Sequence, residues 1–212
     1  MCIKTNKEMK ADAIPGGMTA NVWGRMTLAE QLEVVNRDYA SVTAMLAEAD
    51  ARCVELRKAY ESKCEAADKT RDKKARAAAR RAATQSRASL DRATDNAIEL
   101  NEWRMSLERI AITTKANIIA GAISEAESCL GEDAVIELGD HARGFYNAID
   151  DGNVMGILNT ARGLSAEVRD AESRMRAEGD ARESKGLDAD RHYEAGRALE
   201  LADSIICELF KV

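Results

Sequence analysis

The sequence predicts an all-α protein. We expect an elongated helical hairpin or coiled coil over about residues 27–130, followed by a small bundle of three shorter helices. Composition supports this, because the 212-residue chain has one proline, 4% aromatic residues and an excess of Ala, Glu, Arg and Leu. This mixture is typical of coiled coils and long helices. No run of alternating apolar and polar residues bounded by turn residues predicts a strand.

A regular apolar seam defines the first long helix. Apolar residues recur at alternating steps of four and three, which keeps one stripe facing a partner helix. The seam comprises Leu28, Leu32, Val35, Tyr39, Val42, Leu46, Ala49, Cys53, Leu56 and Tyr60. Just before it, Thr27 and Glu30 have the spacing of a capping box, which predicts a helix start. We expect the large seam residues to pack against another helix, from the same chain or from a second copy.

A basic, small-residue segment follows the seam. Between Cys64 and Leu90 the chain has no large apolar residue, and residues 66–92 carry nine basic and three acidic side chains. Residues 132–212 carry ten basic and eighteen acidic side chains, so an acidic partner exists in the same chain or in another copy. Candidate contacts to a polyanion or an acidic partner are Lys73, Lys74, Arg76, Arg80, Arg81 and Arg87. A solvated helix face is the alternative.

The seam continues through the basic segment with small residues. Ala75, Ala79, Ala82, Ser86, Ser89 and Ala93 trace a second stripe, offset from the first as a stutter would produce. No Gly or Pro lies between Leu28 and Ala120. The best turn candidate is Thr94-Asp95-Asn96, because Asp and Asn side chains compete for backbone groups. An unbroken helix is the alternative.

The chain divides by composition into an N-terminal arm (1–26), long helices with the seam and the basic segment (27–130), and an acidic three-helix region (131–212). In the arm, Pro15-Gly16-Gly17 predicts a turn. Gly131 suits the end of the second long helix. The three shorter helices are expected at about 135–149, after the N-cap Asn153, and from about Asp188, with a polar loop over 179–186.

Catalytic motifs are missing from the sequence. It has no GxSxG, phosphate loop, HExxH or GxGxxG, and only two histidines. Glu137 with His141, and Asp188 with His192, are each four residues apart and could face a metal from two helices. The Glu-x-x-His pattern of di-metal bundles is missing, so charge pairing within each helix is the preferred interpretation. We predict no enzyme, no metal and no cofactor.

Cysteine usage and hydropathy indicate the compartment. Five scattered cysteines without a CxxC pair favour a reducing environment over a disulfide framework. The first residues lack the apolar core of a secretory signal. The most apolar stretch, residues 116–123, is too short to cross a bilayer and is interpreted as a buried helix segment. We expect a cytoplasmic or virion protein without a stable membrane span.

These features favour a non-enzymatic helical subunit of a larger oligomeric complex, binding copies of itself or other proteins of the assembly. In style of composition the chain resembles internal or ejection proteins of short-tailed phages, and the likeness covers no motif and assigns no family. One alternative is a nucleic-acid- or polyanion-associated protein that uses residues 66–92, which lack aromatic side chains for base stacking. The other is a small regulator or inhibitor that binds a host protein.

Overall fold

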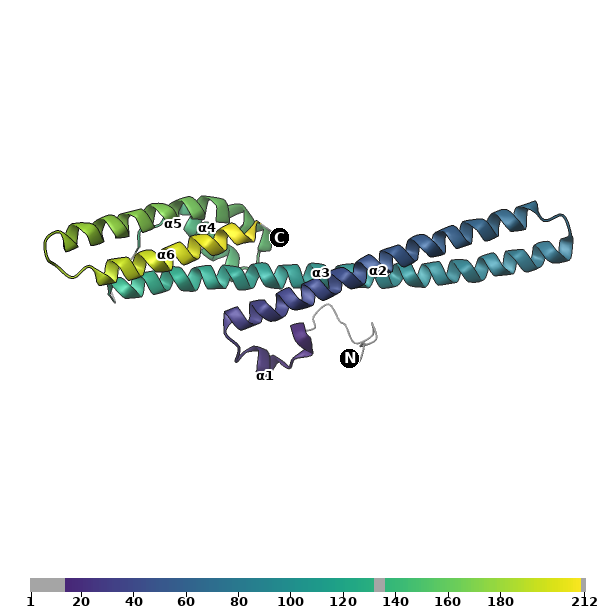
Figure 1. Cartoon of the computed structure of the whole chain (residues 1–212), viewed down its shortest axis with the longest axis horizontal. Helices are drawn as coiled ribbons and strands as arrows, with labels where there is room; N and C mark the ends of the chain where they lie inside the picture. The colour runs from purple at the N-terminus through teal and green to yellow at the C-terminus, as the bar shows by residue number, and fades with distance from the viewer. Residues whose placement is uncertain (1–13, 132–135, 211–212) are drawn as a thin grey trace. The chain divides into compact units, whose positions relative to one another are not determined.

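The computed structural model describes residues 14–131 and 136–210 of the chain. Those residues form helices and no strand, which confirms the predicted fold class (Figure 1). In chain order the elements are η2 (Pro15–Gly17), α1 (Ala20–Trp23), α2 (Leu28–Lys69), α3 (Lys73–Leu130), α4 (Asp140–Asp150), α5 (Val154–Glu183) and α6 (Asp190–Leu209).

The chain folds into two compact units, which are described separately. The hairpin unit contains residues 14–20 and Val34–Glu108, and the bundle unit contains Asn21–Glu33 and residues 109–131 and 136–210. The boundaries between the units therefore lie inside α1, α2 and α3. The division predicted at residues 26 and 130 is based on changes in composition, whereas these units are defined by packing. The predicted division stays a prediction.

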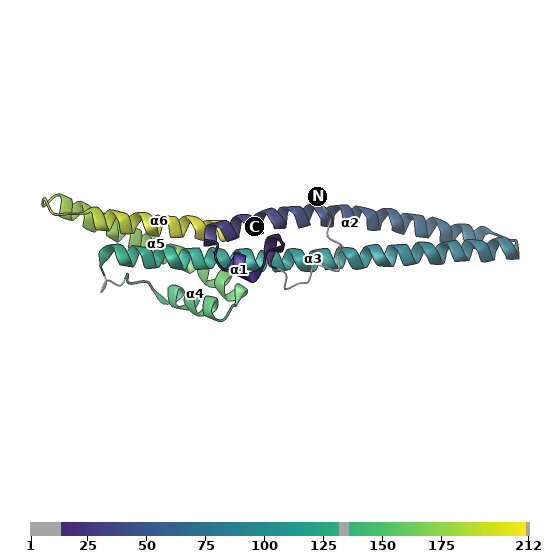
Figure 2. The ribbon, with the colours of Figure 1, turned by 90° about the horizontal axis from the view of Figure 1, so that it is seen from below.

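In the hairpin unit, α2 and α3 run back along each other from a turn at residues 70–72 (Figures 1 and 2). The α2 seam forms the covered stripe, since Val35 and Val42 are fully buried while most side chains between seam positions are exposed. In α3, Leu100 and Leu107 are buried, and nearer the turn the buried residues are Ala83 and Ser86. The packed layer therefore becomes thinner toward the turn.

The position of this turn corrects the prediction. Residues 94–96 lie within the unbroken α3, where the Thr94 hydroxyl donates to the Leu90 carbonyl at 3.0 Å. At the real turn, the Ala75 N–H donates to Asp72 Oδ1 at 2.7 Å, and Arg76 Nε donates to the Thr70 carbonyl at 2.7 Å. These side chains satisfy backbone groups that helix ends leave open, so the turn needs neither Gly nor Pro.

Four helices build the core of the bundle unit, because residues 109–130 of α3 pack with the three shorter helices that the sequence predicted. Ile112, Ile119 and Ile123 recur on one face of α3 and belong to the shared apolar cluster. The largest fully buried side chains of this cluster are Phe145, Ile119, Ile123, Ile157, Leu164, Leu199, Ile206 and Val168.

Several helix ends follow local sequence signals. Asn153 caps α5, its side chain accepting the Gly156 N–H at 2.9 Å, as predicted. The Thr27 and Glu30 capping box is confirmed, with the Thr27 N–H donating to Glu30 Oε2 at 2.8 Å. Hydrogen bonding from the Thr27 backbone and hydroxyl holds the pKa of Glu30 below its ordinary value. At the predicted turn, η2 forms, and the Gly16 N–H donates to the Asp38 carboxylate.

Two predicted boundaries in the bundle unit are wrong. The first of the three shorter helices, α4, begins at Asp140 rather than near Val135, a residue outside the described part of the chain. The predicted loop over 179–186 is partly helical, since α5 continues to Glu183. Gly179 is buried under the Tyr193 ring, where an added Cβ would come within 2.9 Å of a ring carbon. The close approach of the Tyr193 side chain therefore favours glycine at this position of α5.

The apolar stretch at 116–123 is buried as predicted. Ala116, Ile119, Ala122 and Ile123 are almost fully covered in the bundle core. Lys115 is also buried, and its Nζ donates to the Glu208 carbonyl at 3.0 Å, which places a cation at the negative C-terminal end of α6. Within the described residues, no helix has the length and apolar character needed to cross a bilayer.

Candidate functional site: a charged helical hairpin

The predicted seam residues are mostly covered within one copy of the chain. Val35 and Val42 are fully buried, and Leu28 is 37% exposed. The other large members are partly buried; they are Leu32, Tyr39, Leu46, Leu56 and Tyr60. This burial arises in a single chain, so contact of the seam with a second copy stays a prediction.

The six predicted basic residues fall into two groups. Arg76 donates a hydrogen bond to a backbone carbonyl of the turn. The Arg87 guanidinium lies 5.9 Å from the centre of the Tyr60 ring and 3.8 Å from the Asp91 carboxylate. Hydrogen bonding to Tyr60, with the nearby Asp91 charge, raises the pKa of Arg87. The side chains of the remaining four are exposed and form no hydrogen bond or ion pair with the described residues; they are Lys73, Lys74, Arg80 and Arg81.

Charge is segregated along the hairpin. Because Arg87 of α3 contacts Tyr60 of α2, residues near 56 and 92 lie at about the same level. We call residues 57–92 the distal half, and residues 34–56 with 93–108 the proximal half. The distal half carries twelve basic and five acidic side chains, and the proximal half carries three basic and eight acidic. The acidic proximal half is not evident from the sequence alone, because its two segments come together only when the chain turns at residues 70–72.

Most of this charge has no partner within the hairpin. The ion pairs present are local, for example Lys69–Glu65 at 3.2 Å and Arg52–Glu55 at 3.3 Å. Exposed distal bases without a described partner are Arg57, Lys58, Lys63, Arg71, Lys73, Lys74, Arg80 and Arg81. Exposed proximal acids without a described partner are Glu48, Asp50, Asp95, Glu99 and Glu102. The two halves therefore present opposite, unneutralised charge to solvent.

The two halves also differ in their exposed apolar side chains. The proximal half exposes Val54, Ile98 and Met105 at 51%, 53% and 52%. The distal half, which the structure describes throughout, exposes no large apolar side chain and instead presents alanines such as Ala77, Ala78 and Ala88. Contacts with the distal half must therefore be mainly electrostatic.

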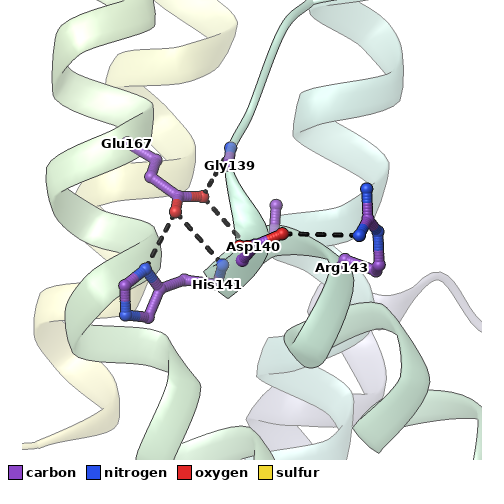
Figure 3. Close-up of polar contacts among 6 residues, drawn as sticks. Gly139, Asp140, His141, Arg143 and Glu167 are labelled. Carbon is purple, nitrogen blue, oxygen red and sulfur yellow. Dashed lines mark hydrogen bonds and ion pairs between the residues drawn. The ribbon is translucent and has the colours of Figure 1, made fainter.

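A second polar cluster lies in the bundle unit, around the Glu167 carboxylate of α5 (Figure 3). Glu167 accepts the backbone N–H groups of Gly139, His141 and Ala142 at 3.0–3.1 Å, and His141 Nδ1 lies 2.9 Å away. Gly139 has no side chain to cap α4, so Glu167 caps this helix from α5. Burial raises the pKa of Glu167, but these hydrogen bonds outweigh it and hold the pKa below its ordinary value.

Both histidines contact glutamates of α5, so their predicted partners Glu137 and Asp188 are wrong. His192 Nε2 lies 3.6 Å from Glu178 Oε2. Glu137 and Asp188 precede α4 and α6, whereas spacing of four gives a common face only inside a helix. In the described part of the chain, no three His, Cys, Asp or Glu side chains are grouped so that they could hold a metal ion.

The bundle unit also contains a polar pocket of about 450 Å³, lined by Arg176, Asp180, Tyr193, Arg197 and Glu200. Arg176 pairs with Glu200 at 2.8 Å, and the Tyr193 hydroxyl donates to Asp180 at 2.8 Å. The bonded carboxylates of Asp180 and Glu183 raise the pKa of Tyr193. Most lining groups are thus already paired with one another, and the pocket offers no activated nucleophile.

Comparisons with known proteins add no relative to this description. No protein-family model, curated protein or solved structure matches the chain.

Proposed function

We propose that this protein is a structural subunit of an oligomeric assembly and acts through its helical surfaces rather than by catalysis. The observation that carries this proposal is the segregated, unpaired charge of the hairpin. Exposed charges scattered at random would be ordinary solvated surface, but long blocks of opposite sign create a field that favours an oriented partner.

The helix lengths support the same function. The 42 residues of α2 and 58 residues of α3 far exceed the mean of about 11–12 residues for globular proteins. Long helices that pack in pairs expose a large surface for the apolar area they bury. Such a surface suits lateral contact with other helices. The resemblance in composition to internal phage proteins makes a virion the first assembly to examine.

Polyanion binding is the second candidate function. Its support is the set of exposed, unpaired bases in the distal half, which could release counterions from a nucleic acid. Three features weigh against it: the acidic proximal half, the net charge of −6 and the scarcity of aromatic side chains near the turn.

Mass measurement in solution tests the two functions. We expect light scattering coupled to size exclusion to give a mass above the 23.1 kDa of one chain at low salt. A mass of one chain at every protein concentration, together with DNA binding that weakens steeply between about 50 and 200 mM salt, would replace assembly by the polyanion function.

A further inference from the structure

We propose that the hairpin unit is self-complementary. The distal half of one copy lies antiparallel along the proximal half of a second copy, and the reciprocal contact forms at the other end. This inference rests on the proposed assembly function and deepens it, because it identifies the partner as a second copy of this chain. It also defines the interface as residues 34–108.

The charges carry this arrangement. The distal half is positive, with twelve basic and five acidic side chains. In the proposed dimer it faces the proximal half of the other copy, which is negative, with eight acidic and three basic side chains. A two-fold axis makes residue i contact j while j contacts i, so one antiparallel pairing satisfies both halves of both copies. A parallel pairing would place like charges against each other. The two blocks of opposite charge therefore favour an antiparallel orientation, and they favour a second copy of the chain as the partner.

The exposed apolar and small side chains of the two halves could add burial to this contact. Each exposed ion pair adds little, so the contact must combine many pairs with some apolar burial. Val54, Ile98 and Met105 of the proximal half are about half exposed and would supply that burial. The exposed alanines of the distal half, among them Ala77 and Ala78, let a facing helix approach closely.

Other partners explain fewer of these observations. A polyanion would neutralise the distal half but meet the acidic proximal half of the same hairpin. The acidic bundle is a poorer partner, because several of its carboxylates are already paired: Asp170 with Arg174, Glu172 with Arg176, Glu178 with His192 and Asp203 with Arg169. A second hairpin leaves neither half without opposite charge.

Reciprocal charge reversal tests the interface. We compare R80E/R81E, which reverses part of the distal half, with E99K/E102K, which reverses part of the proximal half. Each variant alone brings like charges into both contacts and weakens the attraction between the halves, so light scattering at low salt should give a mass shifted from the dimer toward the 23.1 kDa of one chain. An equimolar mixture restores opposite charges and should give twice the mass of one chain. Circular dichroism checks that both variants keep wild-type helicity.

A matched control changes the same number of charges elsewhere. R191E/R197E alters two exposed arginines of α6 that have no partner among the described residues, and it should keep the wild-type mass. At about 0.5 M NaCl the wild-type dimer should dissociate, because a Debye length below about 5 Å screens exposed charges.

The outcomes separate the two proposals. A wild-type protein that is monomeric under all conditions overturns both. If the wild type assembles but the single variants keep its mass, or the mixture does not recover it, assembly stands and the hairpin interface is wrong. If R80E/R81E keeps the wild-type mass and loses binding to a single-stranded DNA oligonucleotide, the distal half is a polyanion site instead.

Discussion

The two units bury their apolar side chains in different ways. In the bundle unit, four helices and the segment before α4 contribute to one cluster, and large side chains such as Phe145, Ile157 and Leu199 are fully covered. In the hairpin unit, a single stripe separates two helices, with Val35 and Val42 near one end and Ala67 and Ala83 near the turn. The bundle is therefore stabilised mainly by burial, and the distal hairpin mainly by helix propensity.

The two units also differ in how their charged side chains are paired. In the bundle unit, Arg169 reaches Asp203 at 2.8 Å across two helices, and Glu167 caps α4 from α5. In the hairpin unit, ion pairs between helices are missing from the described contacts, and the pairs that form are between neighbours on one helix. Ion pairs and caps thus link neighbouring helices of the bundle, whereas charge on the hairpin is available to a partner.

The largest expected effect tests the single stripe of the hairpin. Val42→Asp places a charge at a fully buried seam position and should lower the free energy of unfolding by about 4 kcal/mol or more. Val54→Asp makes the same change at a half-exposed position of α2 and should cost less than about 0.5 kcal/mol. Urea unfolding followed by circular dichroism, at about 0.5 M NaCl to suppress association, compares them. Equal stability would show that the seam does not hold the hairpin.

A cavity in the bundle should have the next largest effect. Phe145→Ala removes a fully buried ring from the shared cluster and should destabilise the protein by about 3–5 kcal/mol. Met155→Ala, at a side chain that is 64% exposed, should change stability by less than about 0.5 kcal/mol. The same denaturant titration measures both variants, and a loss below about 1 kcal/mol for Phe145→Ala would contradict a packed core there.

Loss of the cap that Glu167 of α5 provides for α4 should have a smaller effect on stability. Glu167→Gln keeps the side-chain shape but removes the negative charge of the carboxylate that accepts three backbone N–H groups. The substitution should lower the free energy of unfolding by about 1–3 kcal/mol at neutral pH. Asp140→Asn, at an exposed carboxylate in the first turn of the capped helix α4, is the control and should cost less.

The stabilisation that Glu167 provides should depend on pH. The pKa of Glu167 is lower in the folded state than its ordinary 4.5, so its contribution is complete above that value and is lost as the pH falls through the folded pKa. The wild type should therefore lose more stability than Glu167→Gln when the pH is lowered below about 4.5. Parallel pH profiles for the two proteins would contradict this role.

The smallest predicted effect locates the turn of the hairpin. Asp72→Ala removes the N-cap of α3 and should cost about 1 kcal/mol. Asp95→Ala, in the middle of α3, should change stability by less than about 0.5 kcal/mol, because Ala is the better helix former. Thermal unfolding compares the two. A larger loss for Asp95→Ala would place the turn where the sequence predicted it.

The seam, the capping box and the Asn153 cap could be predicted because each depends on residues close together in the chain. The turn could not, since Asp72 and Asp95 offer similar local capping chemistry. Packing decides between them: folding at 70–72 brings the Ala- and Ser-rich part of α3 beside the end of α2 that lacks large side chains. It also leaves Leu100 and Leu107 of α3 buried, as Val35 and Val42 of α2 are.

The amino-acid sequence by itself determined the helical class, several helix ends and the net charge of each segment, because propensity, capping and composition act over a few residues. The tertiary structure decided that Glu167 rather than Glu137 meets His141, and that Glu99 and Glu102 share the end of the hairpin with Glu48. These relations join residues from 26 to more than 50 positions apart. The physical reason is that side-chain packing chooses which helix faces meet, and local sequence signals leave that choice open.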